Sequence, residues 1–200
     1  MCGRYLFSAA GSKELQAIAE QVRQKYGTKA ASFTMPEEMY PSVTAPVLVS
    51  ENGNITPELQ SWGLPGLRSG LVINARAETV SQRPMFRRSL FDRRCVIPTA
   101  GFYEWDGAKH KYYFHLPYQP VLYLAGIYDN VSGVNSFVIL TTAPNDSMKE
   151  IHDRMPLVLL PEQVGPWLTE PEKVLEILAA EPPMLVKSRT DGQLALDDLA

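Results

Sequence analysis

The spacing of apolar residues along the chain predicts a few helices among many short strands. Leu15, Ile18 and Val22 recur at helical spacing after Ser12, a good N-cap residue, and before Gly27, a common helix end. Pro84 opens another helical pattern, because proline is favoured at the first position of a helix. The further helices are expected over residues 84–91, 162–168 and 172–180.

Short apolar runs between turn signals predict the strands. Asn52-Gly53 is the strongest of these signals, because both residue types accept the positive φ angles of a two-residue hairpin. Residues 136–142 are almost continuously apolar, which is typical of a strand buried on both faces. The expected strands cover residues 47–49, 55–59, 71–73, 95–97, 101–105, 111–116, 121–127, 136–142 and 155–160.

This pattern predicts an α+β fold with a curved, barrel-like, mainly antiparallel sheet and peripheral helices. The chain has no Rossmann-like alternation, no GxGxxG and no P-loop. Its 200 residues, 45% of them hydrophobic, fit one domain over residues 1–200, since no polar linker interrupts them. We find neither a membrane-spanning stretch nor a secretory signal, so we expect a soluble, cytoplasmic protein.

The distribution of charge along the chain is more informative than the net charge. The net charge of −3 argues mildly against nucleic-acid binding, but the arginines are unevenly distributed. Residues 83–94 hold five arginines and one aspartate, which predicts a basic face, although Arg88 and Arg93 are more simply interpreted as solvated helix residues. Two cysteines and three histidines without metal-binding spacing predict no metal and no cofactor.

Cys2 is the first candidate for covalent chemistry. Removal of Met1, which a small second residue permits, would expose an α-amine of pKa about 7.7–8.0 beside a thiol of pKa about 8.5. Both groups are then expected to be nucleophilic near neutral pH. Such a 1,2-aminothiol condenses with an aldehyde to an imine, which the thiol closes to a thiazolidine ring. A frayed terminus without function is the alternative, and Cys2 alone supports both equally.

Four separated motifs favour the chemical interpretation. They are Trp-Gly-Leu at 62–64, Asn-Ala-Arg-Ala-Glu at 74–78, the block 93–105 ending in Gly-Phe-Tyr-Glu-Trp, and Thr-Thr-Ala-Pro-Asn at 141–145. With these motifs the chain resembles, over nearly its whole length, the SOS-response-associated peptidase (SRAP) family. Members of that family crosslink to abasic sites in single-stranded DNA.

The resemblance implies a role for each of four candidate catalytic residues. Cys2 would form the crosslink, and Asn74 would orient the new terminus, although a turn residue is the alternative. Glu104 would move protons during sugar-ring opening and imine formation. Strand alternation places Glu104 opposite the neighbouring aromatic residues, so a solvent-facing glutamate is its alternative. His152 would be a second acid or base, or else a histidine satisfied by backbone groups.

Five further residues are implied in DNA binding. Arg4, Arg76 and Arg154 match positions that contact phosphates, for which the planar guanidinium is well suited. An ion pair with a nearby carboxylate is the alternative for Arg76 and Arg154. Trp62 and Trp105 could stack on bases, or pack in the core, and the sequence leaves this open for Trp62.

Together these residues imply a protein that senses abasic sites in single-stranded DNA and shields them by a covalent bond during the DNA-damage response. The resemblance also implies autoproteolytic and lyase activity. We expect a monomer in the cytoplasm, associated with the nucleoid when DNA is damaged, with no membrane partner.

Two other functions stay open on the sequence alone. An N-terminal-nucleophile hydrolase could pair Cys2 with His152, and a non-catalytic module could bind single strands through the same arginines and tryptophans. The loop 40–46, Tyr-Pro-Ser-Val-Thr-Ala-Pro, departs from the family pattern, which puts its DNA contact in doubt.

Overall fold

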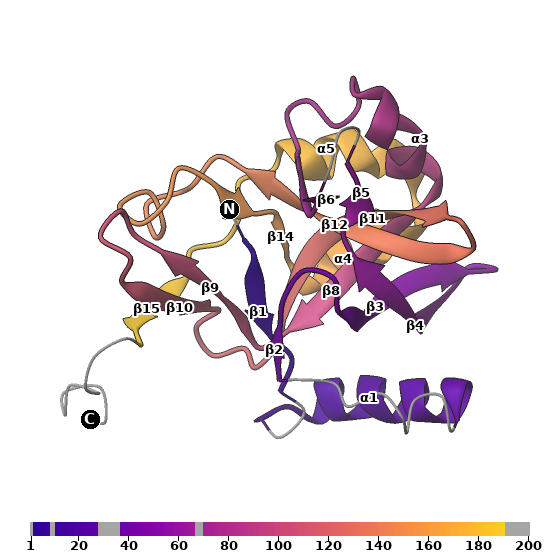
Figure 1. The fold of residues 1–200 in the computed structure, drawn as a ribbon, viewed down its shortest axis with the longest axis horizontal. Coiled ribbons are helices and arrows are strands. Elements are labelled where there is room, and N and C mark those ends of the chain that lie inside the picture. Colours follow the sequence, from indigo (N-terminus) through magenta and orange to yellow (C-terminus); the bar gives the residue numbers. More distant parts are fainter. Residues whose placement is uncertain (1, 9–10, 28–36, 67–69, 191–200) are drawn as a thin grey trace.

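The structure, a computed structural model, describes residues 2–8, 11–27, 37–66 and 70–190 (Figure 1). Its centre is a barrel of five strands, closed because β12 pairs with both β4 and β11. All neighbours in the barrel are antiparallel except β12 and β4, which run parallel. The strands are β3 (Thr44–Glu51), β4 (Asn54–Trp62), β8 (Arg94–Thr99), β11 (Leu122–Val131) and β12 (Val134–Thr142). The predicted fold class is confirmed.

The hairpin between β3 and β4 follows directly from its turn residues. Asn52 and Gly53 have φ angles of 52° and 82°, and Glu51 lies opposite Asn54. Asparagine and glycine accept positive φ with little steric cost, so this turn matches the twist of the two strands. The register of eight residue pairs that follows is the longest antiparallel pairing of β3.

Two of the predicted strands differ from those observed. The run 71–73 contains only β6 (Leu71–Val72), which pairs with β5 (Leu64–Pro65), and a separate strand β7 (Asn74–Arg76) follows it and runs parallel to β12. The run 155–160 becomes β13 (Met155–Pro156) on β12 and β14 (Val158–Leu159) on β11. Leu157 lies between them and bonds to backbone groups of residues 125 and 140, so the chain changes partner there.

A second sheet flanks the barrel and contains the first strand of the chain. Its order is β15 (Val186–Arg189), β10 (Lys111–His115), β9 (Gly101–Trp105), β1 (Arg4–Leu6) and β2 (Glu38–Met39). Strand alternation directs Phe102 and Phe114 inward, where their rings stack 5.2 Å apart. Because β1 lies between β9 and β2, the segment that follows Cys2 is held within this sheet (Figure 1).

The helices lie around these sheets (Figure 1). Helix α1 (Lys13–Tyr26) begins as predicted, with the Ser12 hydroxyl accepting from the Leu15 N–H at 3.3 Å. The predicted helix 172–180 is interrupted, with a 3-10 turn (Pro171–Lys173) before α5 (Val174–Ala179). The other two described helices are α3 (Pro84–Asp92) and α4 (Pro161–Thr169). Among the described residues, no helix is long and apolar enough to cross a membrane.

Arg94 does not belong to the basic face predicted over residues 83–94. It is only 7% exposed, and its guanidinium donates to carbonyl groups in the last turns of α3 and α4. Those carbonyls have no partner within their own helices, so the arginine serves as a shared C-terminal cap. Arg93 and Arg88 are each paired with an aspartate, Asp129 and Asp92. The predicted basic face is therefore reduced to Arg83 and Arg87.

Candidate active site around Cys2

Cys2 is held in the interior of the protein. Its side chain is fully buried, and its Sγ lies 4.0 Å from the Arg4 carbonyl oxygen, to which it donates a weak hydrogen bond. Its own carbonyl oxygen accepts from Asn74 Nδ2 at 3.0 Å. A frayed terminus is therefore the wrong interpretation of Cys2.

Asn74 reaches Cys2 from the edge of the barrel. It begins β7, where it lies opposite Ile139 of β12 in a parallel pairing, so it is a strand residue and not the turn residue of the alternative. Its Oδ1 is buried and has no hydrogen-bond partner among the described residues. An unused acceptor thus lies on the same amide group that holds the Cys2 backbone.

The surroundings of Cys2 keep its thiol protonated. Burial is the main cause that raises the pKa of Cys2 to about 12, and the negative charge of Glu104 adds to it. The expected nucleophilicity of a terminal Cys2 refers to a chain freed of Met1, which this sequence retains, so it stays a prediction. A reaction that needs the thiolate must first provide a base to take the proton.

Glu104, whose charge acts on the Cys2 thiol, is a candidate for that base. It lies on β9, opposite Tyr112 of β10, and is only 5% exposed. Its Oε1 accepts from the backbone N–H of Trp105 at 3.3 Å. Strand alternation does separate Glu104 from its aromatic neighbours, but the face it occupies is the interior one. The solvent-facing interpretation of Glu104 is therefore wrong.

His152 lies on the loop between β12 and β13 and is partly buried. Its Nδ1 accepts from the Arg154 N–H at 3.0 Å, which places the proton of the neutral ring on Nε2. The same Nδ1 lies 2.8 Å from Asp153 Oδ1, a contact that becomes an ion pair only when the ring is protonated. Since the Asp153 side chain is 83% exposed, we take the backbone contact as the one that orients the neutral ring.

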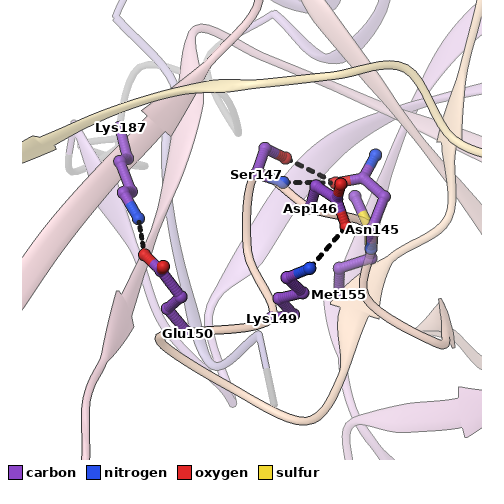
Figure 2. A network of polar contacts seen from close by, with 7 residues as sticks. All are labelled: Asn145, Asp146, Ser147, Lys149, Glu150, Met155 and Lys187. Carbon is purple, nitrogen blue, oxygen red and sulfur yellow. Dashed lines mark hydrogen bonds and ion pairs between the residues drawn. The ribbon is translucent and has the colours of Figure 1, made fainter.

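The loop that carries His152 is fixed by Asn145 (Figure 2). Asn145 Oδ1 accepts from the Ser147 N–H at 3.1 Å, and its Nδ2 donates to the carbonyl groups of residues 182 and 183 at 3.0 Å. Asn145 is 9% exposed, so these bonds satisfy a buried amide. Two ion pairs at the surface complete the network, Lys149–Asp146 and Lys187–Glu150.

Arg154 also fixes this loop. Its guanidinium forms two parallel hydrogen bonds of 2.8 Å with the Glu78 carboxylate and a third of 2.7 Å with the Thr141 carbonyl. The Arg154 side chain is only 12% exposed, so little of its charge faces the solvent. The ion pair that the sequence left open for Arg154 thus forms with Glu78, the last residue of the 74–78 motif.

Arg76 and Arg4 are more accessible. Arg76 is exposed and lines a cavity of about 640 Å³ together with Asn74, Arg83 and Phe86. The Arg4 side chain is 40% exposed, forms an ion pair of 3.1 Å with Glu38 and lies 5.7 Å from the centre of the Trp105 ring.

Trp62 cannot stack on a base in this structure. It is fully buried between Tyr5 and Phe137, and its indole N–H donates to the Ile73 carbonyl at 3.1 Å. The core interpretation that the sequence left open is the correct one. Trp105, by contrast, is partly exposed at the end of β9.

The model of the SOS response associated peptidase (SRAP) family matches residues 1–190. The chain belongs to this family. It is 32% identical over 198 residues to the abasic site processing protein YoqW of Bacillus subtilis, covering 89% of this chain and 86% of that protein. YedK of Escherichia coli, another abasic site processing protein, is 27% identical to this chain. The match covers 85% of this chain and 80% of YedK. A solved structure from Bacteroides thetaiotaomicron has the same fold, with a TM-score of 0.73 at 23% identity over 94% of this chain and 91% of that one.

Two residues that the sequence did not single out lie beside the candidate residue Arg4 of this SRAP protein. Glu38 binds both Arg4 and Lys111, with Lys111 Nζ 2.7 Å from its Oε1. Lys111 could have been found from the hairpin after Trp105, which places the two residues opposite each other. Glu38 had no such signal, because β1 and β2 are joined by a long connection. Within the described part of the chain, no group of three or more His, Cys, Asp or Glu side chains could hold a metal ion.

Proposed function

We propose that this protein processes abasic sites in single-stranded DNA, and that Cys2, once Met1 is removed, bonds covalently to the aldehyde of the abasic sugar. The observation that carries the proposal is a buried Cys2, held by Asn74 and close enough to Glu104 to respond to its charge. The related proteins named as abasic site processing proteins support the same substrate.

The first step of the proposed reaction uses the amine. The Cys2 nitrogen attacks the aldehyde carbon, and loss of one water molecule leaves an imine. Asn74 Oδ1 is a suitable acceptor for an N–H of this amine, since it is buried and unpartnered among the described residues. The lone pair of the nitrogen would then be directed toward the sugar.

The second step uses the thiol. Sγ forms a bond to the imine carbon, the carbon–nitrogen π pair moves to nitrogen, and the thiol proton reaches that nitrogen. Because the pKa of Cys2 is raised to about 12, the thiol needs a proton acceptor, and the Glu104 carboxylate can relay the proton. The product is a thiazolidine ring, and no oxidant or cofactor is consumed.

The same pKa argues against a cysteine peptidase that uses Cys2 alone. Such enzymes depend on a thiolate whose pKa is lowered by a cationic neighbour, whereas burial and Glu104 raise the pKa of Cys2. In the proposed reaction the amine attacks first and the thiol only closes a ring. The autoproteolytic step would then be limited to the removal of Met1.

DNA would approach over the exposed arginines. Arg76 lines the cavity beside Asn74, so a phosphate bound there would bring the adjacent sugar toward Cys2. Arg4 could bind a second phosphate after releasing Glu38. The two terminal nitrogens of Arg154 donate to Glu78 and Thr141, so we assign this residue to positioning the His152 loop.

A denaturing gel tests this function. Protein lacking Met1 is mixed with two single-stranded oligonucleotides that differ only by one abasic site. We expect a band of reduced mobility, stable to denaturation, with the abasic strand alone. A band with both strands, or with neither, would contradict the proposal.

A further inference from the structure

The outer face of the five-stranded sheet carries aromatic rings and cations on neighbouring strands. We call it the aromatic face: Tyr103 and Trp105 of β9, Lys111, Tyr113 and His115 of β10, and Arg4 of β1. All six side chains are partly exposed. They share one face because Arg4 and Tyr113 both lie opposite Tyr103, and Lys111 lies opposite Trp105.

Three of the rings on this face contact a neighbour, either across β9 and β10 or along β10. The ring centres of Tyr103 and Tyr113 are 5.2 Å apart, and those of Tyr113 and His115 are 5.6 Å apart. Gly101 allows this arrangement, because a Cβ there would lie 2.5 Å from Tyr113 Cζ and 2.4 Å from the Phe114 carbonyl oxygen. The Tyr113 ring therefore rests on the backbone of β9, which fixes it as a platform.

Cations are interleaved with the rings. Lys111 Nζ lies 3.8 Å from the centre of the Tyr103 ring and 5.9 Å from that of Trp105, and the Arg4 guanidinium lies 5.7 Å from Trp105. Glu38 bridges both cations, at 3.1 Å from Arg4 and 2.7 Å from Lys111. The carboxylate thus occupies the place between two cations that a phosphate group would also favour.

We propose that the aromatic face binds the single strand as it leaves the abasic nucleotide, with bases stacked on the rings and a phosphate taking the place of Glu38 between Arg4 and Lys111. The inference rests on the proposed function and extends it to Tyr103, Lys111, Tyr113, His115 and Glu38. Two members of the face are linked to the candidate site through the chain, because Arg4 follows Cys2 by two residues and Trp105 follows Glu104 directly.

The chemistry of the face selects a single-stranded nucleic acid. Ring faces accept any base, whereas the bases of a duplex are already stacked and cannot reach them. Cations spaced among the rings match the alternation of base and phosphate along one strand. An apolar protein segment would leave Lys111, Arg4 and Glu38 buried without solvent, which is unfavourable.

Binding of an unmodified 15-nucleotide thymidine strand tests the inference. Fluorescence anisotropy gives the Kd for native protein, for Tyr113→Leu and Lys111→Gln, and for two controls. Tyr118→Ala removes a fully exposed tyrosine outside the face, and Lys25→Gln removes a lysine that also pairs with a glutamate, Glu51, but lies on α1. We expect Kd to rise about tenfold for Tyr113→Leu, the effect of losing about one stacked base, and less than twofold for either control.

The two charge variants should act in opposite directions. Lys111→Gln should weaken binding and reduce the slope of log Kd against log salt by about 0.7, the value for one phosphate contact. Glu38→Gln should strengthen binding several-fold, because the competing carboxylate is removed. A Glu38→Gln variant that binds as native protein or more weakly would overturn the exchange of Glu38 for phosphate.

A measurement on the native protein tests the inference without variants, which could fail to fold. Trp62 and Trp167 are fully buried, so quenching of tryptophan emission by the thymidine strand would report on Trp105. We expect saturable quenching with the same Kd as the anisotropy. If native protein crosslinks abasic DNA but Tyr113→Leu and Lys111→Gln bind as their controls do, the aromatic face is excluded and the proposed function stands. If native protein does not crosslink at all, the proposed function itself fails.

Discussion

Replacing Cys2 by alanine should abolish the covalent adduct with abasic single-stranded DNA. The alanine variant keeps the terminal amine but has no Sγ, so an imine can form and hydrolyse but no thiazolidine ring can close. Noncovalent affinity for single strands should stay close to that of the native protein, because the arginines and the exposed rings are unchanged. The amount of band stable to denaturation, measured over time, gives the result.

Cys95 supplies the matched control for this experiment. It is the other cysteine of the chain, is equally buried, and lies within β8 of the barrel. Cys95→Ala should therefore crosslink at the native rate. Comparable stable adduct from Cys2→Ala, formed without a reducing agent, would show that another nucleophile is used.

Replacing Glu104 by glutamine should slow crosslinking by on the order of 10²-fold, the typical contribution of one general acid–base group. Abasic sugars are mainly closed rings, so a proton must move before the aldehyde exists, and the Cys2 thiol must lose its proton before the thiazolidine closes. Glutamine retains the size of the side chain but cannot accept these protons. The adduct itself should be unchanged.

A second carboxylate variant separates the role of Glu104 from a general effect of replacing a carboxylate. Single-turnover rates with excess protein, compared for native protein, Glu104→Gln and Glu58→Gln, measure the effect. Glu58 lies on β4, and its variant should match native protein. Equal rates in all three would leave His152 as the candidate for proton relay.

Local features of the structure could be predicted from the sequence, because they depend on neighbouring residues. The Asn52-Gly53 hairpin and the Ser12 cap of α1 are examples. The closure of the barrel through the parallel pairing of β12 and β4 could not be predicted, since it joins residues about 75 positions apart, as in Ser61 and Ser136. Hydrophobic periodicity carries no information on which distant strands pair.

The residues of the candidate site could be predicted from the sequence, but the surroundings of their side chains could not. Alternation correctly separated Glu104 from Trp105, but only the packing of the second sheet on the barrel makes the Glu104 face the interior one. Trp62 and Arg94 have residue types common in DNA-binding surfaces, yet both are buried with hydrogen bonds to backbone carbonyls. The sequence cannot show such bonds, since their acceptors lie on other elements.

Mass spectrometry of the crosslinked peptide tests whether Cys2 is the residue that bonds to the abasic sugar. The adduct of native protein with an abasic oligonucleotide is digested with protease and nuclease, and the modified peptide is fragmented. We expect a peptide that begins at Cys2 without Met1, carries the sugar on its first residue, and has the same mass after borohydride treatment because no imine remains. A sugar on any other residue, or a modified peptide that retains Met1, would contradict it.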